Sequence, residues 1–191
     1  SGEIIFESEQ LLKNSHKKMR NIRGKKIAMI FQEPMTSLNP VFTIGELLSE
    51  VIQLQQRISK KTVLVNLNAL LQEVGIDSSR RHAYPHEFSG GMRQRVMIAM
   101  ALANKPSFLI ADEPTTALDA TTSKQIIQLL LTAKKNRGMS MLFISHDLRL
   151  VASISDEVYV IRSGVVVEHG TSDRVLQHPT NRYTQALLAC Q

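Results

Sequence analysis

Two neighbouring carboxylates, Asp112 and Glu113, stand directly after the short apolar run 108–111. Such a run, followed by polar residues and Pro114, predicts a strand that is buried on both faces of a parallel sheet. Ligands of open α/β sheets bind at the carboxyl ends of the strands, because the loops that leave this edge converge there. The aspartate could hold Mg²⁺ beside phosphate oxygens, and the glutamate could orient or deprotonate a water. A solvated acidic turn is the simpler alternative.

A second group with chemical potential is the run Ser89, Gly90 and Gly91. Serine is a good N-cap, and glycine lets a ligand approach the backbone closely, so the run predicts the start of a helix. Free N–H groups and the positive end of the helix dipole favour an anion there. This helix start would suit a phosphate group. An ordinary helix cap is the alternative.

Two further polar residues end apolar runs that predict strands. Gln32 follows the run 26–31, and His146 follows soon after the run 139–144. A glutamine at a strand end is usually a turn residue, and a single histidine there is usually a hydrogen-bonded bystander. Because parallel strands end at one edge of a sheet, both residues are expected near Glu113.

The order and spacing of these segments resemble those of ATP-binding-cassette (ABC) ATPases. The matching segments are a Q-loop glutamine at Gln32, a signature at 88–95, a Walker B strand at 108–113, a D-loop aspartate at Asp119 and a switch histidine at His146. Each signal is weak alone, whereas their common order is specific. The resemblance implies an α/β fold of the P-loop NTPase (RecA-like) type, with ATP and Mg²⁺ as ligands.

The resemblance also implies a division of labour around the γ-phosphate of ATP. Asp112 would hold Mg²⁺, and Gln32 would contact Mg²⁺ or the attacking water. Glu113 would orient or deprotonate that water, and His146 would contact the γ-phosphate and help to fix the water. Catalysis by this group would rest on positioning and charge stabilisation.

In this family two ATP-binding subunits pair around two ATP molecules. The resemblance therefore places Ser89, Gly90 and Gly91 against the nucleotide of the opposite subunit. Asp119 would shape the dimer interface, although an acidic residue before the predicted helix 121–137 is favourable by itself.

The chain is expected to divide into three parts. Residues 1–33 would belong to the ATPase core, residues 34–103 would form an inserted helical subdomain, and residues 104–191 would complete the core. Within the insertion, prolines predict a loop over 33–40. Helices are expected over 43–57 and 60–74.

The amino-acid sequences of several segments most resemble those of the oligopeptide and dipeptide importer branch of the family. These segments are 31–40, 84–88 and 178–184. Nickel and glutathione importers share this branch, so the residues leave the cargo open. The partners implied are a second ATP-binding subunit, transmembrane permease subunits and, indirectly, a solute-binding protein. The implied location is cytoplasmic, at the inner face of the cell membrane.

The phosphate-binding loop Gly-x-x-x-x-Gly-Lys-Ser/Thr does not occur in these 191 residues. Its backbone cradle and lysine have no substitute among the carboxylates. We therefore expect an N-terminally truncated fragment that also stops early at its C-terminus. Such a fragment should expose apolar sheet surface, bind Mg-ATP weakly and be inactive alone.

Composition excludes several classes of protein. A hydrophobic content of 43% with 21% charged residues indicates a globular chain, and no apolar run is long enough to span a bilayer. The single Cys190 permits no internal disulfide. The net charge of +6 is scattered, so nucleic acid is not expected as a partner. A DNA-repair ABC ATPase and a non-catalytic docking subunit are the competing hypotheses.

Overall fold

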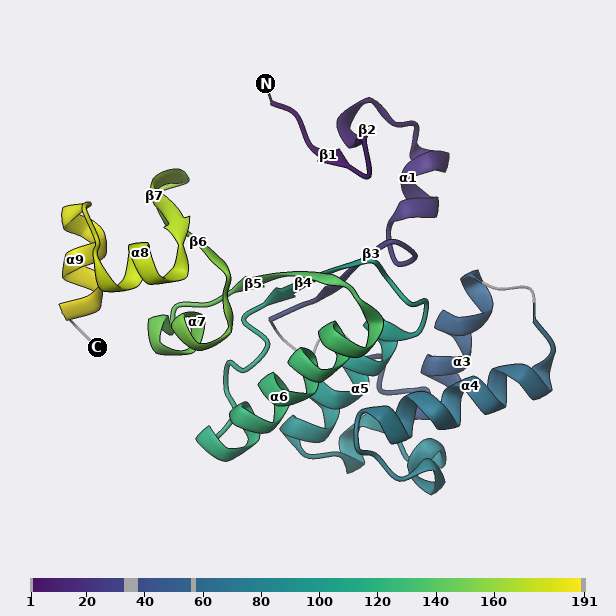
Figure 1. Ribbon diagram of the computed structural model, residues 1–191. Coiled ribbons are helices and arrows are strands. Elements are labelled where there is room, and N and C mark those ends of the chain that lie inside the picture. The colour runs from purple at the N-terminus through teal and green to yellow at the C-terminus, as the bar shows by residue number, and fades with distance from the viewer. Residues whose placement is uncertain (1, 33–37, 56–57, 190–191) are drawn as a thin grey trace. The chain divides into compact units, whose positions relative to one another are not determined.

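The computed structural model describes residues 2–32, 38–55 and 58–189, which form two compact units divided between Leu142 and Phe143. Figure 1 shows the helices and strands: β1 (Ile5–Phe6), β2 (Glu9–Gln10), α1 (His16–Ile22), β3 (Ile27–Ile30), α3 (Ile44–Gln55), α4 (Lys60–Glu73), α5 (Gly90–Leu102), β4 (Phe108–Asp112), α6 (Ala120–Arg137), β5 (Ser140–Ile144), α7 (Leu148–Ile154), β6 (Glu157–Arg162), β7 (Val165–Thr171), α8 (Ser172–Gln177) and α9 (Arg182–Ala189). The predictions for residues 33–37, for the helix end at Arg57 and for Cys190 lie outside the described residues.

The first unit is built on a sheet with the strand order β3-β4-β5. β3 and β4 are parallel, and their register runs from Ile27 beside Phe108 to Ile30 beside Ala111. Both strands therefore end at the same edge. The predicted parallel arrangement of these two apolar runs is confirmed, and it aligns the polar residues that follow them.

Alternate residues of these strands differ in burial. In β4, Leu109 and Ala111 are fully buried, whereas Phe108 and Ile110 are half-buried. In β3, Met29 is 38% exposed between two buried neighbours. The prediction that the 108–111 strand is buried on both faces is therefore wrong. Helix α5 packs against β3, and the opposite side of the sheet keeps accessible apolar side chains.

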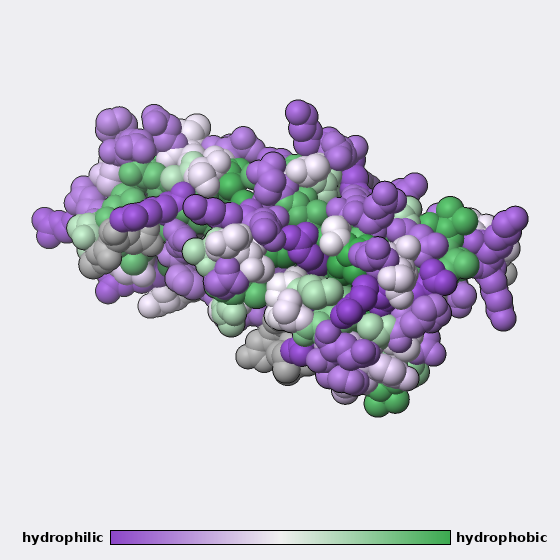
Figure 2. Space-filling view, turned by 90° about the horizontal axis from the view of Figure 1, so that it is seen from below, coloured by the Kyte–Doolittle hydropathy of each residue, from purple (hydrophilic) through white to green (hydrophobic). Residues whose placement is uncertain are grey.

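Exposed apolar residues also occur on β5, where Leu142 and Ile144 are 46% and 42% exposed. The prediction of a buried strand there is wrong for the same reason, because a side chain on the uncovered face of a sheet stays accessible. Figure 2 shows hydrophobic side chains among hydrophilic ones on the face seen from below. The expected exposure of apolar sheet surface is thus observed.

The helices α3, α4 and α5 pack against one another in the first unit (Figure 1). In α4 the residues Val63, Leu67, Leu70 and Leu71 recur at helical spacing, and all four are buried. Ser59 caps this helix, because its hydroxyl accepts a hydrogen bond from the Thr62 amide over 3.2 Å. The predicted helix over 60–74 is confirmed.

Arginine side chains connect the helices. Arg137, at the end of α6, donates to both carboxylate oxygens of Glu73 on α4, over 3.0 and 2.6 Å. It also donates to the Leu102 carbonyl at the end of α5 over 2.7 Å. Arg95 of α5 donates to the Val74 carbonyl after α4 over 2.8 Å. The C-terminal carbonyls of two helices thus receive charged donors, which the helix dipole favours.

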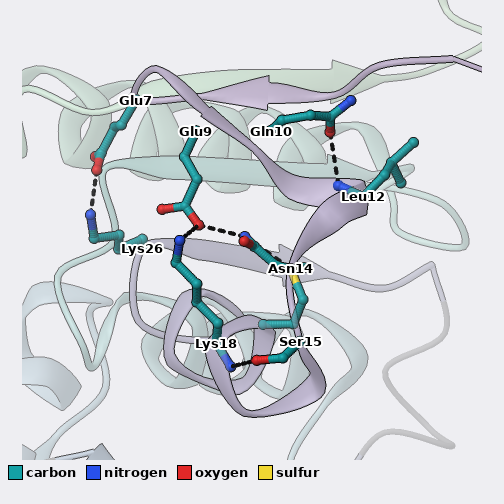
Figure 3. A network of polar contacts seen from close by, with 9 residues as sticks. Glu7, Glu9, Gln10, Leu12, Asn14, Ser15, Lys18 and Lys26 are labelled. Carbon is teal, nitrogen blue, oxygen red and sulfur yellow. Dashed lines mark hydrogen bonds and ion pairs between the residues drawn. The ribbon is translucent and has the colours of Figure 1, made fainter.

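The start of the chain is fixed by a polar network, drawn in Figure 3. Glu7 pairs with Lys26 beside β3, and Glu9 pairs with Lys18 of α1. Phe6 packs edge-on against Phe108, with ring centroids 6.3 Å apart. These contacts attach the β1–β2 hairpin and α1 to the sheet.

The second unit contains the antiparallel pair β6–β7 and the helices α7, α8 and α9. The hairpin turns at Ser163 and Gly164, with φ of 50° and 78°, which are the positive values that a two-residue type I′ turn requires. The core of the second unit consists of buried aliphatic residues: Val151, Val158, Val160, Val175 and Leu176.

Glu168 of β7 accepts hydrogen bonds from the Thr180 amide and hydroxyl over 2.7 and 2.8 Å. The Thr184 side chain, followed by the Thr180 amide, lowers the pKa of Glu168 to about 2. The carboxylate therefore fastens the segment before α9 to the hairpin. No helix in the described part of the chain is both long and apolar enough to cross a membrane.

Candidate functional site

The side chains of Gln32 and Glu113 meet at the carboxyl edge of the first sheet. Ile30 lies beside Ala111 in the parallel pair, so the residues two positions further along each chain come level. Gln32 Nε2 donates to Glu113 Oε2 over 3.2 Å, across 81 residues of sequence. The register of β3 and β4 thus brings together the predicted Q-loop glutamine and the predicted Walker B glutamate.

Glu113 adopts a backbone conformation that is rare for residues other than glycine. Its φ is 44°, a left-handed value that costs such a residue about 1–3 kcal/mol. Thr116 closes the turn, because its amide donates to the Glu113 carbonyl over 3.2 Å. The Thr116 hydroxyl also donates to Glu113 Oε2 over 2.7 Å.

Thr116 is a site residue that the sequence interpretation missed. A signal was present, because a hydroxyl residue three positions after the glutamate, in a turn with Pro114, often returns a hydrogen bond to the start of the turn. The more obvious pattern in this stretch is the acidic residue Asp119 before the predicted helix 121–137.

Asp112 is the last residue of β4 and is half-buried. Across residues 2–32, 38–55 and 58–189, no three His, Cys, Asp or Glu side chains are grouped closely enough to hold a metal ion. Mg²⁺ needs only one or two protein carboxylates when phosphate oxygens and waters complete its shell. A single carboxylate such as Asp112 is compatible with Mg²⁺ that arrives with a nucleotide, and the role of Asp112 as its ligand stays a prediction.

The predicted helix start at Ser89 is confirmed. Ser89 Oγ accepts a hydrogen bond from the Met92 amide over 3.3 Å, and α5 begins at Gly90. Ser89 and Gly90 are both exposed. The positive end of the α5 dipole is thus accessible to an anion, and its role in binding a γ-phosphate stays a prediction.

Gly91 has a structural reason for its small size. A Cβ built there would lie 2.4 Å from Thr122 Cγ2 of α6, far inside van der Waals contact. The same construction at Gly90 meets Leu118 at an ordinary 3.5 Å. The small size of Gly91 therefore allows the close approach of α6, and its predicted role beside a ligand stays a prediction.

Asp119 is the N-cap of α6. Its carboxylate accepts hydrogen bonds from the Thr121 amide, the Thr122 amide and the Thr122 hydroxyl, over 3.0, 2.9 and 2.6 Å. The Thr122 hydroxyl and amide lower the pKa of Asp119. This local role explains the residue within one chain, and its role at a dimer interface stays a prediction.

His146 lies in the stretch between β5 and α7 and is exposed. The next residue, Asp147, caps α7 by accepting a hydrogen bond from the Leu150 amide over 3.0 Å. His146 belongs to the second unit, whereas Gln32 and Glu113 belong to the first. The approach of His146 to Glu113 therefore stays a prediction.

Comparison with known proteins identifies relatives of the whole sequence. The chain is 50% identical over 190 residues to the oligopeptide transport ATP-binding protein OppD of Bacillus subtilis (strain 168), covering 98% of this chain and 53% of OppD. It is also 50% identical over 191 residues to the glutathione import ATP-binding protein GsiA of Escherichia coli (strain K12), covering 99% of this chain and 30% of GsiA. The chain thus spans about half, or less, of these relatives.

A solved structure shares the fold. The ATP-binding cassette MJ0796, in a dimeric post-hydrolysis state bound to ADP and Pi, superimposes with a TM-score of 0.80. The two sequences are 26% identical, and the match covers 90% of this chain and 74% of MJ0796. The predicted α/β fold of an ABC ATPase is confirmed.

The sequence model of the family described as ABC transporter matches residues 1–116, which is more than half of the 191 residues. This match includes Gln32, the helix start at Ser89 and the carboxylates of Asp112 and Glu113. The chain therefore belongs to the ABC transporter family.

Proposed function

We propose that this chain is part of the ATP-hydrolysing subunit of an ABC importer that takes up peptides. The observation that carries the proposal is the hydrogen bond between Gln32 and Glu113. It joins two segments that are distant in sequence at the edge of the sheet where nucleotides bind in α/β folds. The similarity to OppD, an oligopeptide transport protein, and to GsiA, a glutathione import protein, supports the choice of cargo.

In the proposed reaction, water attacks the γ-phosphate of ATP and ADP leaves. Glu113 orients the water and accepts its proton, while Gln32 holds the glutamate and the water in line. His146 contacts the γ-phosphate. Mg²⁺, held by Asp112, would neutralise negative charge on the phosphates. These side chains act by positioning and charge stabilisation, which dominate phosphoryl transfer.

A second ATP-binding subunit completes the proposed site. The exposed helix start at Ser89 and Gly90 suits the γ-phosphate of a nucleotide held by that subunit. Gly91 allows α5 and α6 to approach, so that this helix start is held firmly. Asp119 lies at the start of α6, next to the same region. When the two ATP-binding subunits close around ATP, they would pass this motion to permease subunits in the membrane, which a solute-binding protein supplies with cargo. The proposed location of the chain is the inner face of the cell membrane.

The proposal is tested with the complete protein and its permease subunits in lipid vesicles. ATP turnover is measured with a binding protein loaded with an oligopeptide, with glutathione or with nickel. The proposal predicts that one of the two peptide ligands stimulates turnover. Stimulation by nickel alone would overturn the peptide assignment. Salt-sensitive stimulation by duplex DNA would instead support a DNA-repair ATPase.

A second candidate cargo within the same class is glutathione, itself a tripeptide. It is favoured by one specific observation, because the identity to GsiA equals the identity to OppD at 50%. The glutathione arm of the vesicle experiment separates the two candidates. A stronger response to glutathione than to a tetrapeptide or pentapeptide would assign the chain to glutathione import.

A further inference from the structure

The carboxylate of Glu113 is held by two donors that reach the same oxygen. Gln32 Nε2 lies 3.2 Å from Oε2, and the Thr116 hydroxyl lies 2.7 Å from it. The two donors come from different strand ends, one after β3 and one from the turn after β4. The shorter of the two bonds is the one from Thr116.

Thr116 also fixes the backbone of the glutamate. The Thr116 amide donates to the Glu113 carbonyl over 3.2 Å, which closes the turn around Pro114 and Thr115. Glu113 needs this support, because a φ of 44° is unfavourable for a residue with a Cβ. One residue therefore constrains both the main chain and the side chain of the glutamate.

We propose that Thr116 is a positioning residue for ATP hydrolysis, which holds the Glu113 carboxylate at the place where it meets the attacking water. This inference rests on the proposed function, because it assigns Thr116 a role in that same reaction. Thr116 acts through Glu113 and takes no proton itself. Its hydroxyl restricts rotation of the glutamate side chain, so the carboxylate is placed before the nucleotide arrives.

The expected effect of losing the hydroxyl is moderate. Misplacement of a reacting group by about 1 Å can cost roughly 100-fold in rate. In Thr116→Val the turn keeps its backbone hydrogen bond and Gln32 keeps its contact, so the carboxylate loses the donor supplied by the Thr116 hydroxyl. We expect kcat to fall about tenfold, with the KM for ATP unchanged.

The test uses the complete protein and compares three variants. Thr116→Val keeps the branched shape and removes the hydroxyl, whereas Thr116→Ser keeps the hydroxyl and removes the methyl group. Thr132→Val is the matched control, because Thr132 is exposed on α6 and its hydroxyl bonds only to the Gln128 carbonyl of the same helix. The proposal predicts a low kcat for the Thr116→Val variant alone.

A fourth measurement separates positioning from damage to the fold. In a Glu113→Gln background, Thr116→Val should reduce turnover no further, because the group that it positions is already lost. An additional loss of similar size in that background would overturn the inference. A kcat for Thr116→Ser as low as that for Thr116→Val would also overturn it, since the hydroxyl would then be irrelevant.

The remaining outcomes distinguish this inference from the proposed function. If the complete wild-type protein hydrolyses ATP and Thr116→Val leaves kcat unchanged, the inference fails and the proposed function stands. If the wild-type protein hydrolyses no ATP with all its partners present, the proposed function fails and the inference fails with it.

Discussion

Substitution of Gly91 by alanine tests the packing of the signature helix. The added methyl carbon would lie 2.4 Å from Thr122 Cγ2, so one of the two helices must shift. Thr122 cannot simply rotate, because its hydroxyl donates to Asp119 over 2.6 Å and so fixes the direction of Cγ2. Overpacking of this kind typically costs about 1–3 kcal/mol.

Two opposing effects set the net magnitude. Alanine is favoured over glycine within a helix by about 1 kcal/mol, and this gain offsets part of the overpacking cost. We therefore expect Gly91→Ala to lower the free energy of unfolding by up to about 2 kcal/mol. For a chain of this size the loss corresponds to a fall in Tm of up to roughly 8 °C.

The second substitution, Thr122→Ser, isolates the cause. Serine keeps the hydroxyl that bonds to Asp119 and removes only Cγ2, which is the atom in conflict. Urea unfolding of Gly91→Ala, Thr122→Ser and the double variant completes a double-mutant cycle. The double variant should recover at least the stability of Thr122→Ser. If Gly91→Ala changes the stability of the Thr122→Ser background by the same amount as it changes that of the wild type, the packing explanation for Gly91 is refuted.

Three further predictions concern contacts outside the site. Arg137→Lys should lower the free energy of unfolding by about 2 kcal/mol, because lysine cannot serve both oxygens of Glu73 and the Leu102 carbonyl. Urea unfolding checks this, with Arg20→Lys on α1 as an exposed control. Because folding lowers the pKa of Glu168 to about 2, from an ordinary 4.5, its stabilisation is complete above pH 4.5 and is lost as the pH falls toward 2. Glu168→Gln should weaken that dependence in thermal unfolding between pH 6 and pH 2. Thr180→Val should do the same in part, and an unaltered dependence in both variants would contradict the assignment.

Much of the fold follows from local sequence pattern. The apolar runs that became β3 and β4 are followed by Gln32 and Glu113, and the rule that parallel strands share one carboxyl edge was enough to predict their meeting. Helix α4 can be predicted in the same way, since its apolar residues recur at helical spacing. It ends before Gly75, whose φ is 72°. Residues that cap helices, such as Ser89, can also be predicted from the sequence, because only a few residue types favour the N-cap position.

What escaped prediction depends on contacts between distant segments. The packing of Gly91 against α6 was not predicted, because the sequence does not show that Thr122 comes to lie against it. Thr116 was not identified from the sequence, because the strained turn at Glu113 is invisible without coordinates. The half-exposed state of Ile110 depends on which face of the sheet the helices cover, and strand periodicity alone does not choose a face.

The central claim is that Glu113 is the residue that orients the attacking water. The most direct test is the rate of ATP hydrolysis by the complete protein with and without Glu113→Gln, at saturating ATP and Mg²⁺. The account predicts a fall of about 100-fold or more in kcat, since a positioned general base contributes at least that much, while ATP still binds. A Glu113→Gln variant that hydrolyses ATP at the wild-type rate would contradict the account.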